Sequence, residues 1–238
     1  PRAHRKFLLE YFTGAYDDSL ARGQPFGHNE KSGDSRISGS LASLVGLEVA
    51  LERDDPAAIQ RSIDLILLLH GMIMSFGGIP LLYYGDEIGM LNDFSYMTDA
   101  EKAHDSRWIH RPLIDWDKAE RRHQKGSPEQ RLFDGIRKMI AVRKSTPAFA
   151  DFNNRELIDT GNPHLFVFMR SNPFELSDHV LVVGNFDDAP QSLTLSDLGN
   201  RGEFEYARLR DLCSGEAPSL FKDQLVIPPF RFYWLSSR

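Results

Sequence analysis

The spacing of apolar residues changes near residue 152, and this change limits the possible folds more than any other feature. Before it, apolar residues recur every three or four positions, which is typical of amphipathic helices. After it, they form short runs between turn-forming residues, which is typical of an antiparallel sandwich or barrel. These runs are 165–170, 179–183, 191–195, 205–209, 224–227 and 231–235. We therefore expect the 238 residues to hold an α/β part followed by an all-β domain.

Capping residues mark the longest predicted helices. Asp55 can cap a helix over 56–76 that begins with proline at its first position and ends at Gly77. A serine followed by proline likewise predicts a helix over 127–143. Two further helices are expected over 1–12 and about 40–51, with a glycine-rich loop over 14–39 between them.

Residues 79–84 are an apolar and aromatic run with almost no alternation, which predicts a strand buried on both faces, as in a parallel sheet. Acidic residues follow it directly, at the end of a parallel barrel strand where functional residues gather. Asp86 and Glu87 are adjacent, however, and neighbouring side chains of a strand point to opposite faces. They are therefore interpreted as residues that end the strand, and no catalytic pair is assigned in this chain.

Composition and charge exclude several classes of function. The net charge of −6 and a sequence pI of ≈ 5.8 argue against a nucleic-acid-binding protein with a broad basic surface. No apolar stretch reaches the roughly 18 residues that span a bilayer, since 63–76, the longest, contains Asp64 and His70. The single cysteine, Cys213, excludes an internal disulfide and favours a cytoplasmic location without fixing it. The histidines form no metal-binding pattern and no nucleotide loop is present, so we expect no metal and no cofactor.

Several motifs resemble those of the α-amylase family, glycoside hydrolase family 13. The run 78–90, which contains Leu-Leu-Tyr-Tyr-Gly-Asp-Glu, resembles the family's eighth barrel strand, and 105–108, Asp-Ser-Arg-Trp, resembles the loop after it. The closing run 228–235 is similar to the end of the family's C-terminal β domain. Segments 21–26 and 33–39 resemble a narrower group, amylosucrase and sucrose hydrolase.

This resemblance implies the C-terminal part of a (β/α)8 barrel followed by an antiparallel β-sandwich domain. Residues 1–55 would be the end of the insertion after strand seven, 56–150 the last part of the barrel, and 151–238 the β-sandwich. The catalytic carboxylates of such enzymes would precede residue 1. We therefore expect this chain to need the missing N-terminal part of the same enzyme and to be inactive alone, because two strands cannot close a barrel.

The resemblance also implies a retaining enzyme that takes glucosyl from sucrose, releases fructose, and passes glucosyl to a glucan, an oligosaccharide or water. Arg107 would pair with an aspartate from the preceding segment and close the glucosyl subsite, since a guanidinium can hold a carboxylate bidentately. Arg36 and Arg5 would line the acceptor side, where their donors suit sugar hydroxyls. The other substrate-binding candidates are Phe7, for an apolar face, and Asn29 and Asp34, for polar contacts.

Two positions depart from the amylosucrase pattern. Gly27 stands where a larger polar residue is expected, and Ser35 where a cysteine can precede the arginine. Both changes favour hydrolysis over polymer synthesis. Two alternatives stay open: a non-catalytic carbohydrate-binding or structural module, favoured by the β half, and another family member such as an α-glucosidase or trehalose-forming enzyme. The sequence fixes neither the acceptor length nor the oligomeric state.

Overall fold

The structure, a computed structural model, describes residues 2–198 and 208–237. The chain divides into two compact units, Pro1–Ile66 with Leu82–Phe133 and Leu67–Leu81 with Asp134–Arg238. Helices α4 (Pro56–Phe76) and α6 (Pro128–Ser145) contribute residues to both units. The boundaries between the units fall inside these two helices and not at the expected domain limits after residues 55 and 150. Those limits stay predictions.

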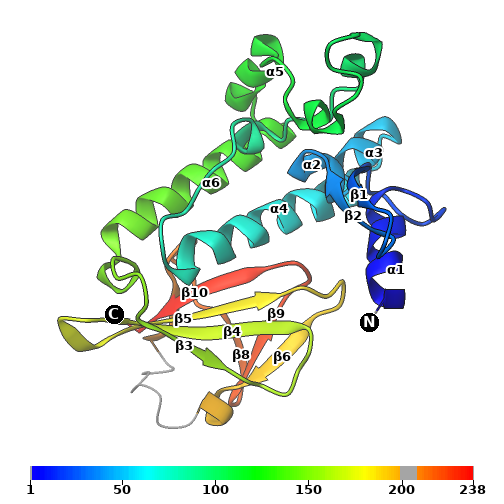
Figure 1. The fold of residues 1–238 in the computed structure, drawn as a ribbon. Coiled ribbons are helices and arrows are strands. Elements are labelled where there is room, and N and C mark those ends of the chain that lie inside the picture. Colours follow the sequence, from blue (N-terminus) through cyan, green and yellow to red (C-terminus); the bar gives the residue numbers. More distant parts are fainter. Residues whose placement is uncertain (1, 199–207, 238) are drawn as a thin grey trace. The chain divides into compact units, whose positions relative to one another are not determined.

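The first unit begins with α1 (Arg2–Phe12), as expected, and continues into the hairpin of β1 (Gln24–Asn29) and β2 (Asp34–Ser38) (Figure 1). The hairpin lies in the segment that the sequence predicted as a loop, so that prediction was wrong. Strand β1 contains Pro25 and Gly27, residues that are unusual inside strands and that hid the hairpin. Cross-strand pairing and a turn at Asn29, whose Oδ1 accepts hydrogen bonds from two backbone N–H groups, form the hairpin.

The single helix predicted after the hairpin is two short helices, α2 (Leu41–Leu44) and α3 (Leu47–Glu52). Gly46 separates them with a φ of 95°, a left-handed conformation that ends one helix and caps the next. The loop predicted after residue 89 contains several short helical turns. The turns in this loop are Ser95–Thr98, Ser106–His110, α5 (Trp116–Glu120) and Arg121–His123. Another helical turn, Asp86–Ile88, lies just before the loop.

Residues 79–84 do not form the predicted buried strand. They have no ladder partners, and Ile79 and Leu81 each keep 83% of their surface exposed. A parallel strand requires neighbouring strands for its N–H and C=O groups. Every strand pair in the described part of the chain is antiparallel, and none includes this segment.

Helix α4 has the predicted limits. Asp55 caps it by accepting hydrogen bonds at Oδ1 from the N–H groups of Ala57 and Ala58, at 3.0 and 3.1 Å. By length and composition this 21-residue helix could cross a membrane, which corrects the expectation that no segment is long enough. The helix nevertheless places side chains such as Ile63 and Leu68 in the protein core, with at most 1% exposed.

The second unit carries two antiparallel sheets, in the orders β3-β4-β5-β10-β7 and β6-β9-β8 (Figure 1). Most predicted strands are present. The run 205–209 lies largely outside the described residues, and three short strands, β3, β7 and β8, were not predicted. The bounds are β3 (Arg155–Ile158), β4 (Leu165–Asn172), β5 (Glu175–Asn185), β6 (Gln191–Thr194), β7 (Arg210–Asp211), β8 (Ser219–Phe221), β9 (Gln224–Ile227) and β10 (Phe232–Ser236).

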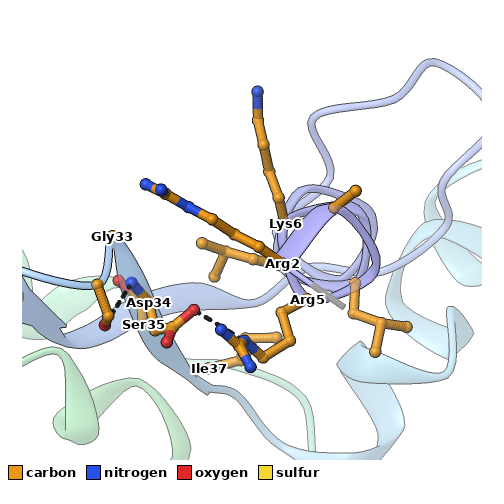
Figure 2. Close-up of a pocket in the computed structure, with 11 residues that line it drawn as sticks. Arg2, Arg5, Lys6, Gly33, Asp34, Ser35 and Ile37 are labelled. Carbon is orange, nitrogen blue, oxygen red and sulfur yellow. Dashed lines mark hydrogen bonds and ion pairs between the residues drawn. The ribbon is translucent and has the colours of Figure 1, made fainter.

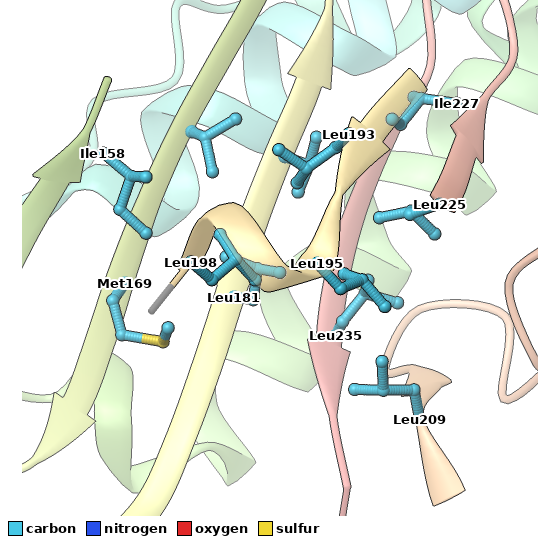
Figure 3. Close-up of a cluster of buried hydrophobic side chains, with 12 residues drawn as sticks. Ile158, Met169, Leu181, Leu193, Leu195, Leu198, Leu209, Leu225, Ile227 and Leu235 are labelled. Carbon is cyan, nitrogen blue, oxygen red and sulfur yellow. The ribbon is translucent and has the colours of Figure 1, made fainter. Parts of the chain in front are cut away.

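Strands of both sheets contribute to one apolar core, in which Leu181, Leu225 and Leu235 are fully buried (Figure 3). Within the same unit, Gly71 of α4 lies directly against the ring of Phe232. A Cβ atom at Gly71 would lie 2.8 Å from three ring carbons, so only glycine allows this approach of helix and strand. The fold of this unit is thus set by apolar burial and by close backbone contact.

Candidate functional site

Two of the predicted site residues meet at Phe26 in the β hairpin. Arg36 is the cross-strand partner of Phe26, and its Cζ atom lies 6.0 Å from the centroid of the ring. Arg107 comes from the helical turn Ser106–His110 and places its Cζ atom 5.0 Å from the same centroid. These distances suit cation–π contact. We call Phe26, Arg36 and Arg107 the Phe26 cluster.

The partner of Arg107 in the structure is Asp105. Nε of Arg107 lies 2.8 and 3.0 Å from the two carboxylate oxygens of Asp105, and Nη2 lies 2.7 Å from Oδ2. Asp105 also accepts a hydrogen bond from the backbone N–H of Arg107, at 3.0 Å, and so caps the turn. The Arg107 guanidinium lowers the pKa of the Asp105 carboxyl to about 2, and Asp105 in turn raises the pKa of Arg107.

A cavity of about 590 Å³ borders the Phe26 cluster, and Arg107 and Phe26 both line it. Its wall combines apolar and aromatic side chains with imidazole and guanidinium groups, a mixture that suits a polyhydroxylated ligand with one less polar face. The hydroxyl of Tyr96 donates to Oε1 of Gln24, and the hydroxyl of Ser106 donates to the carbonyl of Pro25, at 3.1 Å. These bonds tie the loop to the hairpin.

A second cavity, of about 530 Å³, lies between α1 and the hairpin (Figure 2). Nε of Arg5 donates to Oδ1 of Asp34 at 3.0 Å across it. Hydrogen bonding to Ser32, followed by the bond and charge of Arg5, lowers the pKa of the Asp34 carboxyl. Arg2 and Lys6, which also line this cavity, extend away from that ion pair (Figure 2).

The six predicted residues therefore separate into groups. Arg36 and Arg107 meet at Phe26, and Arg5 meets Asp34 at the second cavity. The ring of Phe7 packs with Tyr11 and Tyr16 at centroid distances of 6.0 and 5.5 Å. Asn29 serves the hairpin turn.

Two residues that complete the site, Phe26 and Asp105, were not selected from the sequence. Both lie inside segments whose resemblance was noted, 21–26 and 105–108, so position within the motif was the signal that could have found them. The acidic residues after 79–84 have a local role. Oε2 of Glu87 accepts a hydrogen bond from the backbone N–H of Gly85 at 2.8 Å. Across the described residues, no three His, Cys, Asp or Glu side chains lie close enough to hold a metal ion.

Comparison with known proteins gives this architecture a family context. Residues 155–234 match the family model of the maltogenic amylase C-terminal domain. The chain is 27% identical over 262 residues to trehalose synthase/amylase TreS of Mycobacterium tuberculosis, covering 98% of this chain and 39% of that protein. The chain thus spans about two fifths of the length of this curated relative.

Solved structures show the same fold. A pullulanase from Anoxybacillus sp. LM18-11 superposes with a TM-score of 0.55 and 14% identity, over 99% of this chain and 30% of that chain. A mutant of the trehalulose synthase MutB from Pseudomonas mesoacidophila MX-45, in complex with its substrate sucrose, gives a TM-score of 0.50 and 21% identity, over 72% of this chain and 38% of that chain. Together the comparisons support a relation to the C-terminal portion of α-amylase-family proteins, and the family match at 155–234 covers the antiparallel sheets of the second unit.

Proposed function

We propose that this chain is the C-terminal portion of a retaining α-glucosyl enzyme that acts on sucrose and transfers the glucosyl group to a glucan or to water. The observation that carries this proposal is the meeting of Arg107 and Arg36 at Phe26, beside a cavity with aromatic and polar walls. The family context and the sucrose complex of MutB support it. On this proposal, residues 56–150 complete a (β/α)8 barrel.

In this function the chain binds and orients, and the bond-breaking carboxylates come from the preceding part of the enzyme. Retaining cleavage needs two carboxyl groups about 5–5.5 Å apart, one on each side of the glycosidic bond. Arg107 closes the glucosyl subsite, where the N–H groups that Asp105 leaves unused face the terminal glucosyl unit and the aspartate of the preceding segment. Arg36, whose guanidinium lies over the same Phe26 ring, faces the acceptor side. Arg5 and Asp34 bind the acceptor further away, at the second cavity.

The test is an Arg107→Ala variant of the full-length protein. We expect sucrose turnover to fall at least about a hundredfold, since the loss of charge-assisted hydrogen bonds removes roughly 3 kcal/mol or more of transition-state binding. Arg137→Ala is the matched control, because Arg137 is also an exposed arginine paired with an aspartate, Asp134 at 3.2 Å. Near-normal turnover of sucrose by the Arg107 variant would contradict the proposal.

The curated relative favours a second candidate, a trehalose-forming enzyme. The similarity to TreS covers nearly the entire length of this chain, and trehalose also consists of glucosyl units. Product analysis separates the two functions. Fructose with free glucose or glucan from sucrose supports the first, whereas trehalose formed from another glucosyl disaccharide, with sucrose left intact, supports the second.

A further inference from the structure

The contact between Asp105 and Arg107 uses only one edge of the guanidinium. An arginine side chain has five N–H donors, one on Nε and two on each Nη. Asp105 binds the edge formed by Nε and Nη2, at distances of 2.7 to 3.0 Å. Within the described part of the chain, Nη1 donates to no side chain or carbonyl. Three N–H donors therefore remain for a ligand while the pair with Asp105 stays intact.

Asp105 itself is held firmly. Its backbone N–H donates to the carbonyl of Lys102 at 2.9 Å, and its carboxylate caps the turn that follows. The Asp105 side chain keeps 16% of its surface exposed, against 47% for Arg107. The guanidinium is therefore fixed along one edge by a partly buried carboxylate and on one face by the ring of Phe26.

We propose that Asp105 is a positioning residue that holds the guanidinium of Arg107 with its Nη1 end free to bind the glucosyl unit. This inference rests on the proposed function. Its physical basis is that a long, half-exposed arginine samples many rotamers, and binding is weakened whenever those rotamers must first be restricted. Asp105 restricts them before the sugar binds.

The decisive variant is Asp105→Asn in the full-length protein. Asparagine keeps the side-chain shape and caps helical turns as well as aspartate does, so the turn persists. It loses the negative charge and can accept from the guanidinium through one oxygen only. We expect the KM for sucrose to rise about tenfold to a hundredfold, in line with the loss of hydrogen bonds to a charged group.

KM is the informative constant because it separates positioning from folding. A variant that merely reduced the folded fraction would lower the apparent kcat and leave KM unchanged. Asp115→Asn is the matched control. Asp115 also caps a helix, by accepting from the N–H of Lys118 at 3.0 Å, and lies outside the site, so its KM should stay at the wild-type value.

A second comparison tests whether Asp105 acts through Arg107. In an Arg107→Lys background, the added Asp105→Asn change should have no further effect, because lysine cannot be held along a planar edge. If Asp105→Asn leaves KM within twofold of the wild type while Arg107→Ala abolishes turnover, the positioning role is wrong and the proposed function stands. If Arg107→Ala turns over sucrose normally, the proposed function and the positioning role both fall.

Discussion

Arg170 of β4 provides the sharpest test of how the second unit is held together. Its side chain is fully buried and donates to three oxygens: Oδ1 of Asn154 at 2.6 Å, the carbonyl of Ser75 near the end of α4, and the carbonyl of Asp151. Burial lowers the pKa of the guanidinium to about 10, so it remains charged at neutral pH. This charge near the end of α4 also suits the helix dipole.

We predict that Arg170→Met destabilises the second unit by about 3 kcal/mol. Hydrogen bonds from a charged donor contribute about 1.5–3 kcal/mol each. Methionine fills similar space but leaves one buried and two partly buried acceptors without this donor, at about 1–3 kcal/mol for each. Removal of a buried charge returns several kcal/mol of desolvation free energy, which offsets part of the loss. Arg143 still donates to the carbonyl of Met74, in the last turn of α4, so the helix end keeps one charged donor.

Hydrogen exchange of the β4 amides in the full-length protein measures this change within the unit. A loss of about 3 kcal/mol raises the exchange rate of globally protected amides roughly 150-fold. Arg210→Met is the control, because Arg210 is an exposed arginine of the same sheet whose Nη1 donates to the adjacent carbonyl of Leu209 at 2.8 Å. Exchange within fivefold of the wild type in Arg170→Met would refute the reasoning.

Two further predictions concern the same unit. Gly71→Ala should destabilise it by about 1–3 kcal/mol, since the new methyl group would press on the ring of Phe232, and unchanged protection of the β10 amides would contradict this. Cys213 should react with iodoacetamide at pH 8 about a hundredfold more slowly in the native protein than after unfolding, because burial raises the pKa of its thiol. Peptide mapping measures this rate, and equal labelling of both states would show the thiol to be accessible.

The parts of the fold that the sequence predicted are those with local signals. Helix α4 has its cap at Asp55 and its glycine stop at Gly77, so its limits could be placed without tertiary information. The long β strands have apolar runs of their own. The segment 79–84 differs, because an apolar run becomes a strand only with hydrogen-bonded neighbours, and hydrophobicity alone does not supply them. The short strand β7, Arg210–Asp211, is defined entirely by its pairing with β10.

In the candidate site, too, the sequence indicated single residues, but not the contacts that depend on distant parts of the chain. Motif resemblance selected Arg36 and Arg107 as candidates but gave no indication that both lie against one phenylalanine ring. That arrangement depends on the register of the hairpin, which pairs Phe26 with Arg36. Register follows from long-range hydrogen bonds and turn geometry. Arg5 and Asp34 were predicted separately, and their ion pair follows from the packing of α1 beside β2.

The contrast between Arg107 and residues 79–84 bears on how this site is built. The partner of Arg107 is two positions away, and the loop that carries both residues is tied to β1 by the bond from Ser106 to Pro25. Its orientation is thus set by contacts within one unit. By contrast, Ile79 and Leu81 are left exposed, and no strand among the described residues pairs with them. If Arg107 binds the glucosyl unit as proposed, its binding geometry is formed by the local loop and the hairpin.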